Sequence, residues 1–290
     1  MRYGTGMALV LAAGTLWSFQ ALIIRQIGDA GPWTILFWRS LAMLPVLLLF
    51  ISWRSGGPPL PAIRKAGIAG VLGGIGLIAA MGGAIAAFQW TTVANAAFLL
   101  AASPFLAALL GRAILGEAVA PRTWTAIAIA LVGIFVMVRE GLAAGAWLGN
   151  LAALASALGF AAFTVSLRWR RLEDSLPSVV LGSLFSIIAG AIIASRLGQP
   201  LAVSTPDLLW CVLMGVVTLS GGMILYTLGS KVVPSAELAL LSNTEVMLAP
   251  FWVWLLMGET ASTGTFVGGA ILLAAILLNA LAGARRAAPA

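Results

Sequence analysis

The chain alternates between long apolar stretches and short polar or charged segments. The longest stretch lies between Lys65 and Arg112 and contains 46 residues without a charged side chain. As a single helix it would be about 69 Å long at about 1.5 Å per residue, whereas the hydrocarbon core of a bilayer is about 30 Å thick. It therefore predicts two membrane-spanning helices joined by a turn at the polar residues 89–92.

The same pattern recurs along the whole chain, where charges, prolines and glycine pairs separate ten apolar segments. The first follows Arg2 as a signal peptide would, but its uncharged stretch of 22 residues is longer than the usual about 7 to 15. We therefore interpret it as an uncleaved span. The predicted spans are 5–26, 33–52, 66–88, 93–113, 122–138, 146–167, 177–195, 207–229, 235–257 and 262–282.

Composition agrees with a polytopic helical membrane protein. Hydrophobic residues make up 61% of the chain and charged residues only 9%, a profile that no soluble core of this size requires. Lys and Arg outnumber Asp and Glu by 16 to 9, but these charges stand singly or in small groups between apolar segments. We therefore expect the lipid bilayer as a partner, and no nucleic acid. The lone Cys211 excludes an intramolecular disulfide.

The distribution of basic residues predicts the orientation of the chain. Ten spans place both termini on one side of the membrane, and cytoplasmic loops are enriched in Lys and Arg. Only Arg25, Arg139 and Arg196 fall on the side opposite the termini. On the terminal side lie Arg2, Arg54, Arg64, Lys65, Arg112, Arg122, Arg168, Arg170, Arg171, Lys231, Arg285 and Arg286. We therefore expect a multi-pass protein of the bacterial inner membrane with both termini in the cytoplasm.

An internal repeat relates the two halves of the chain. A shift of 142 residues places Gly116-Glu117 on Gly258-Glu259. Because each half has an odd number of spans, the second half enters the membrane from the opposite side, as in transporters with an inverted repeat. The predicted fold class is an all-α polytopic membrane protein with ten transmembrane helices in two inverted five-helix repeats, residues 1–141 and 142–290.

Several of these features together carry a family resemblance. They are the two five-helix halves, Trp17-Ser18 in the first span, Arg39 early in the second, and Leu-Gly-Glu and Met-Gly-Glu at the ends of the fourth and ninth. In these respects the chain resembles the drug/metabolite transporter superfamily, EamA-like branch, over nearly its whole length. The resemblance implies export of small metabolites, often amino acids, through a central cavity between the halves.

Residues that many enzymes need are missing from the sequence. The chain has no histidine, which excludes Ser-His and Cys-His catalysis and histidine-based metal sites. It also lacks the phosphate-binding loop Gly-x-x-x-x-Gly-Lys-Ser/Thr. Asp29, Asp174 and Asp207 lie at predicted helix ends, which argues against an intramembrane aspartyl pair. We expect a transporter with a small-molecule substrate, and no enzyme activity, cofactor or metal.

Arg39 is a candidate substrate-binding residue. An ionisable side chain deep in a span costs about 2.5 to 3.5 kcal/mol on insertion scales, so its presence suggests a function. The guanidinium of Arg39 could bind a substrate carboxylate in a bidentate geometry. The alternative is a permanent ion pair with a glutamate such as Glu245, and a pair that opens on binding would combine both roles.

The tetrapeptide 242–245 is the most polar one inside any predicted span. Ser242 and Glu245 share one helix face, and we include Ser242, Asn243 and Glu245 among the candidate substrate-binding residues. Glu245 could hold a substrate ammonium group or carry a coupling proton, and a structural role is the alternative. Trp17 and Tyr226, deep in their spans, are candidate cavity walls for a partly apolar ligand, or packing aromatics.

Two further patterns predict helix contacts. Glu117 and Glu259 end the fourth and ninth spans, and we expect each carboxylate to accept bonds from the N-terminus of the following helix. Span 66–88 carries small residues at spacings that let helix backbones approach closely. These residues are Gly67, Gly70, Gly73, Gly74, Gly76, Gly82 and Gly83.

The sequence thus predicts a monomeric exporter of small metabolites that works by alternating access. Amino acids with apolar or aromatic side chains are the expected substrates, because Arg39, Glu245 and the aromatic residues could match a carboxylate, an ammonium group and a side chain. A drug or sugar-nucleotide carrier is the alternative within transport. A channel remains a further alternative.

Overall fold

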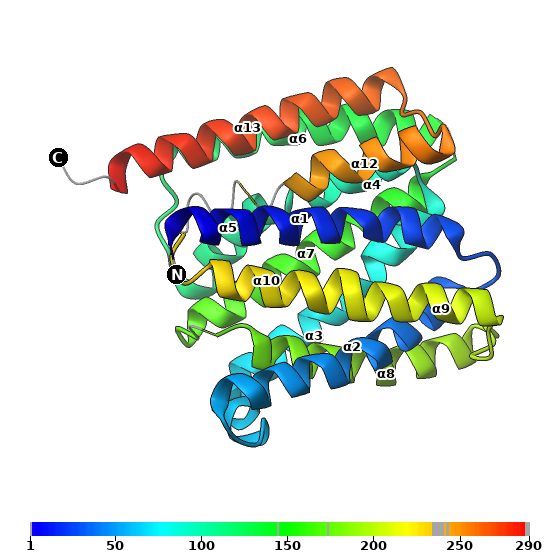
Figure 1. Ribbon diagram of the computed structural model, residues 1–290. Helices are drawn as coiled ribbons and strands as arrows, with labels where there is room; N and C mark the ends of the chain where they lie inside the picture. The colour runs from blue at the N-terminus through cyan, green and yellow to red at the C-terminus, as the bar shows by residue number, and fades with distance from the viewer. Residues whose placement is uncertain (1, 144, 173, 234–240, 242–243, 288–290) are drawn as a thin grey trace.

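The computed structural model describes residues 2–143, 145–172, 174–233, 241 and 244–287. Within them, the first half of the chain forms α1 (Tyr3–Gln26), α2 (Pro32–Ser55), α3 (Leu60–Trp90), α4 (Val93–Leu100), α5 (Ser103–Leu115) and α6 (Pro121–Ala143). The second half forms α7 (Trp147–Trp169), α8 (Leu176–Arg196), α9 (Thr205–Leu213), the π-helix η1 (Met214–Gly221), α10 (Gly222–Gly229), α12 (Thr244–Met257) and α13 (Thr263–Ala287). The described chain is a bundle of helices that run back and forth (Figure 1).

The number of apolar helical segments agrees with the predicted fold class. Eight segments in the described chain are long and apolar enough to cross a membrane, with α4–α5 counted as one and α9–η1–α10 as another. The helices at 244–257 and 263–279 add two shorter apolar segments. Because a helix satisfies its own backbone hydrogen bonds, it is the element that can cross lipid at such lengths. The predicted all-α fold is confirmed.

Local sequence explains where the fourth segment begins and breaks. The turn predicted at 89–92 is confirmed, since α3 ends at Trp90 and the Thr92 hydroxyl accepts a hydrogen bond from the backbone N–H of Asn95 at 3.3 Å. The single helix predicted at 93–113 is wrong in one respect, because the α-helix is interrupted at residues 101–102. Pro104 lies in the first turn of α5, and its ring cannot continue a regular helix from the preceding turn.

The two halves interlock. Helix α1 packs against α12 and α10 of the second half, and its counterpart α7 packs against α5 and α3 of the first half. The pairs α2 with α8 and α6 with α13 also cross between the halves; α6 and α13 lie side by side along one edge of the bundle (Figure 1). Each of these contacts has its counterpart in the repeat, as the inverted arrangement requires.

Glycines bring α3 and α7 into backbone contact. A Cβ atom on Gly76 would lie 2.8 Å from the carbonyl oxygen of Gly159, and one on Gly83 would lie 2.7 Å from that of Ala152. The predicted close approach is therefore confirmed at these positions. Gly67 differs, because its φ of +54° marks a kink near the start of α3 and a Cβ there would meet no atom within 4 Å.

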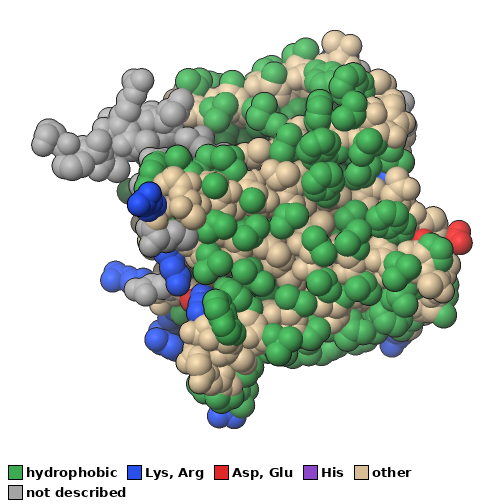
Figure 2. Space-filling model, viewed as in Figure 1, with side chains coloured by type: hydrophobic (Ala, Val, Ile, Leu, Met, Phe, Trp, Pro, Cys, Tyr) green, Lys and Arg blue, Asp and Glu red, His purple; other side chains and the backbone are tan. Residues whose placement is uncertain are grey.

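Basic side chains gather at one end of the bundle. Helix α1 begins and α13 ends there (Figure 1), and we call it the terminal end. Figure 2 shows most of the visible Lys and Arg side chains at this end, while the middle of the molecule carries hydrophobic and uncharged groups. This arrangement suits a protein whose apolar middle lies in lipid and whose ends meet water.

Candidate functional site

Three neighbouring residues of α1 each contact a different helix. Trp17 packs on Tyr226 of α10, with ring centroids 5.6 Å apart. The Ser18 hydroxyl accepts a hydrogen bond from Trp252 Nε1 of α12 at 2.9 Å. Gln20 Oε1 accepts a hydrogen bond from Arg39 Nη1 of α2 at 3.4 Å. The middle of α1 therefore joins three other helices at one level of the bundle.

Arg39 is buried without an acidic partner among the residues that the structure describes. Only 2% of the residue is exposed, and its Nε atom is buried with no hydrogen-bond partner. Its guanidinium forms no salt bridge with any carboxylate of the described residues, so the structure does not show the alternative of a permanent pair with Glu245. A buried guanidinium in this state can accept an anionic partner, because its planar N–H groups match a carboxylate.

The backbone around Arg39 is held from two sides. Trp38 Nε1 donates a hydrogen bond to the carbonyl oxygen of Leu201 at 2.7 Å, which fixes α2 to the segment before α9. On the other side, Gly215 of η1 lies directly against the Arg39 carbonyl oxygen, where a Cβ atom would not fit. The π-helix thus brings a glycine to the point of closest approach, and π-helical turns are frequent at functional sites.

Aromatic rings pack against one another around residues 17–19 of α1. Phe19 stacks on Trp252, with ring centroids 5.0 Å apart and planes inclined by 13°. Together with the Trp17–Tyr226 pair, this gives a cluster of aromatic rings from α1, α10 and α12. Such surfaces suit a ligand with an apolar or aromatic group.

Glu245 lies in the first turn of α12, before Trp252 on the same helix. Trp252 follows it by seven residues, so the two side chains share a helix face about 10.5 Å apart along the axis. The half-buried Glu245 carboxylate forms no hydrogen bond or salt bridge with another described residue. No described residue therefore competes with a proton or a cationic group for this carboxylate.

The structure brings only some of the predicted residues together. Trp17 and Tyr226 are in contact, and Arg39 is hydrogen-bonded to Gln20, which lies three residues after Trp17 on α1. Ser242 and Asn243 lie outside the described residues. Sequence reasoning missed two contact residues. Gln20 could have been predicted as a site residue, because it is an amide deep in an apolar span. Nothing in the sequence distinguishes Trp252 from tryptophans that only pack.

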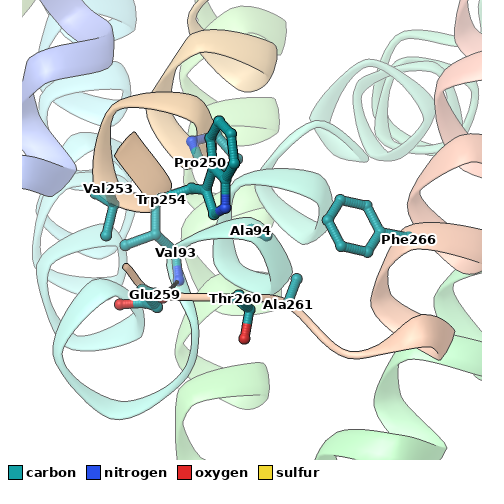
Figure 3. Close-up of a pocket in the computed structure, with 9 residues that line it drawn as sticks. All are labelled: Val93, Ala94, Pro250, Val253, Trp254, Glu259, Thr260, Ala261 and Phe266. Carbon is teal, nitrogen blue, oxygen red and sulfur yellow. Dashed lines mark hydrogen bonds between the residues drawn. The ribbon is translucent and has the colours of Figure 1, made fainter. Parts of the chain in front are cut away.

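A small pocket occurs elsewhere, at the end of the bundle opposite the terminal end. Its volume is about 180 Å³, and it lies between α4, α12 and the start of α13 (Figure 3). Trp254 and Phe266 in its lining are residues with exposed fractions of 53% and 56%. None of the predicted site residues that the structure describes lines it, so we do not assign the transport site to this pocket.

Glu259, which also lines the pocket, corrects one prediction. Its Oε1 accepts a hydrogen bond from the backbone N–H of Val93 at the start of α4, at 2.6 Å. The N-terminus of the following helix is instead capped by Ser262, whose hydroxyl accepts from the N–H of Thr265 at 3.2 Å. Glu117 likewise binds Arg168 of α7, at 2.7 Å. The helix that follows each glutamate in the sequence was the wrong partner. Because the halves interlock, helices of the opposite half lie nearer to each carboxylate.

The fold and the site define a polytopic membrane protein whose two interlocked halves enclose a buried arginine. The EamA-like transporter family matches residues 4–139 and again 147–281, so the chain belongs to this family. It is 27% identical over 285 residues to an uncharacterized transporter of Archaeoglobus fulgidus, with 96% of each chain covered. A solved crystal structure with 19% identity has a TM-score of 0.66 over 94% of this chain and 96% of that one, which shows a common fold. The chain is thus a membrane transporter of small molecules.

Proposed function

We propose that this transporter exports amino acids with apolar or aromatic side chains by alternating access between its two halves. One observation carries the proposal: Arg39 is 2% exposed and has no carboxylate partner among the described residues. A buried, unpaired charge is costly, typically by several kcal/mol. A substrate that neutralises this charge would bind favourably, because it removes the free-energy cost of the unpaired charge.

A carboxylate is the substrate group that fits this position. Two parallel N–H···O bonds can form between a guanidinium and a carboxylate, which fixes the orientation of the ligand as well as its charge. Gln20 supports this role because its Oε1 holds Nη1, while Nε remains without a partner. The amide orients the guanidinium without neutralising it.

The rest of the amino acid has partners nearby. The rings of Trp17, Tyr226 and Trp252 offer an apolar surface. It lies at the part of α1 where Gln20 binds Arg39. Glu245, on the same α12 face as Trp252, would bind the ammonium group or carry a coupling proton. We further propose that the protein acts as a monomer.

The distribution of basic residues supports an orientation for the proposed export. The terminal end carries most of the Lys and Arg residues in the sequence, which favours a cytoplasmic location under the positive-inside rule. We therefore place the terminal end in the cytoplasm of a bacterial cell, with the opposite end beyond the inner membrane. In this orientation, the proposed export carries the substrate from the terminal end to the opposite end.

Counterflow in proteoliposomes loaded with each of the twenty amino acids tests the proposal. We expect saturable, trans-stimulated exchange of a subset with apolar or aromatic side chains. Arg39→Lys should abolish or strongly weaken this exchange, because the ammonium group of lysine cannot replace the two parallel hydrogen bonds of a planar guanidinium. Arg64→Lys, on an exposed arginine of α3, is the matched control and should behave as wild type. Flux that does not saturate would indicate a channel, and exchange of drugs or sugar nucleotides alone would indicate the alternative carrier.

A further inference from the structure

Three salt bridges within the described part of the chain join the first half to the second. The three pairs are Arg25–Glu259, Arg54–Asp174 and Arg168–Glu117. Two of them are related by the internal repeat, because a shift of 143 residues places Arg25 on Arg168 and a shift of 142 places Glu117 on Glu259. The third pair has no such counterpart, since Pro32 stands where the repeat would require a carboxylate for Asp174.

The Arg25–Glu259 pair lies at the end opposite the terminal end. Arg25 Nη2 lies 2.9 Å from Glu259 Oε2 and also donates to the carbonyl oxygen of Thr91 at 2.8 Å. The second carboxylate oxygen accepts from Val93, at 2.6 Å. This pair therefore ties the end of α1 to the end of α12 and to the turn between α3 and α4. We call it the Arg25 latch.

The Arg168–Glu117 pair repeats this arrangement at the terminal end. Arg168 Nη1 lies 2.7 Å from Glu117 Oε2, and Nη2 donates to the carbonyl oxygen of Ala107 at 2.8 Å. Gly111 leaves room for both groups, because a Cβ atom there would clash with the Glu117 carboxylate. The pair ties the end of α7 to the end of α5, and we call it the Arg168 latch.

We propose that the two latches hold opposite ends of the transport pathway closed and that each must break for its own end to open. The inference rests on the alternating access of the proposed function. When one half rocks against the other, the halves separate at one end and approach at the opposite end. An arginine and a carboxylate on different halves cannot remain within hydrogen-bond distance at the end that opens. The inverted repeat supplies one repeat-related pair for each end, and Arg54–Asp174 adds a second pair between the halves at the terminal end.

The two latches differ in strength. The side chains of Arg25 and Glu259 are 22% and 23% exposed, whereas those of Arg168 and Glu117 are 41% and 38% exposed. Water screens an exposed ion pair more strongly, and the Arg25 latch also holds the Val93 N–H. Loss of the Arg25 latch should therefore shift the balance between the two open states further than loss of the Arg168 latch.

Cysteine labelling can read each end separately. Thr91 and Ala107 supply the carbonyl groups that the two latch arginines bind, and both residues are 8% exposed. In full-length protein with Cys211→Ser, Thr91→Cys reports on the Arg25 latch and Ala107→Cys on the Arg168 latch. The measured quantity is the rate of reaction with a polar maleimide.

Neutralising one carboxylate should open one end and close the other. Glu259→Gln should raise the labelling rate of Thr91→Cys by about twofold to fivefold, the range typical of a partly exposed ion pair, and lower that of Ala107→Cys. Glu117→Gln should do the reverse, by a smaller factor. Glutamine at either position keeps an acceptor oxygen but removes the charge, so the folded chain should survive.

Controls separate latch opening from general loosening. Arg25→Gln should reproduce the effect of Glu259→Gln, whereas Arg196→Gln and Arg112→Gln, which remove exposed charges at the two ends, should leave both rates unchanged. Unchanged rates in both glutamate variants, or an increase at both reporters in either variant, would overturn the proposal. Because labelling needs no substrate, a failure of amino acid counterflow would refute the proposed substrate and leave this test intact.

Discussion

Replacing Arg39 by leucine separates a substrate-binding role from a structural one. Breaking a buried ion pair costs about 3 to 5 kcal/mol because it strands the partner, but Arg39 has no such partner among the described residues. The change removes one long hydrogen bond to Gln20, and an orphaned amide costs about 1 to 3 kcal/mol. It also relieves the desolvation penalty of a buried cation, several kcal/mol. We therefore expect Arg39→Leu to melt at the same temperature as wild type or higher.

Substrate affinity should respond in the opposite direction. A hydrogen bond to a charged group contributes about 1.5 to 3 kcal/mol, and about 1.4 kcal/mol corresponds to a factor of ten. Losing the carboxylate contact should thus raise the half-saturation concentration of counterflow by roughly 10-fold to 150-fold. Thermal melting of the purified protein and counterflow at graded substrate concentrations measure both quantities, with Arg64→Leu as the control. A large fall in melting temperature with unchanged half-saturation would refute the reasoning.

Three further predictions follow from the same structure. Glu245→Gln should leave the melting temperature nearly unchanged but alter counterflow or its pH dependence, and identical transport at every pH from about 5 to 8 would restrict Glu245 to packing. Gly76→Ala should lower stability by about 1 to 3 kcal/mol, because its methyl would lie 2.8 Å from a carbonyl oxygen of α7; Gly4→Ala, with no atom within 4 Å of its Cβ, should not. Reporters fused after residue 286 should be cytoplasmic and those inserted near residue 143 should not, and a periplasmic reporter after 286 would contradict the proposed orientation.

The ten apolar segments could be predicted from sequence because lipid imposes one strong rule. A chain that crosses a bilayer must satisfy its backbone groups internally, so helix length and hydropathy together define each span. The repeat was visible because Gly-Glu recurs after 142 residues. By contrast, the π-helix η1 has no comparable signature, since its residues are as apolar as those of the α-helices beside it.

The contacts of the candidate site could be predicted only in part. Arg39 was recognisable because a charge inside a span is costly, but its contact with Gln20 depends on how α1 and α2 face each other. The partner of Glu259 was missed because helix order along the chain does not give helix order in space when the halves interlock. The repeat held a usable signal, since Arg25 and Arg168 stand in matching positions like the two glutamates.

Competition between an amino acid and its amide tests the central claim most directly. The two compounds differ only in whether the carboxylate that Arg39 would bind is present. In wild-type proteoliposomes we predict that the amide inhibits counterflow at least about tenfold more weakly than the amino acid, since a charged hydrogen bond contributes about 1.5 to 3 kcal/mol. In Arg39→Leu this difference should disappear. Equal inhibition by both compounds in the wild-type protein would contradict the assignment of Arg39 as the carboxylate-binding residue.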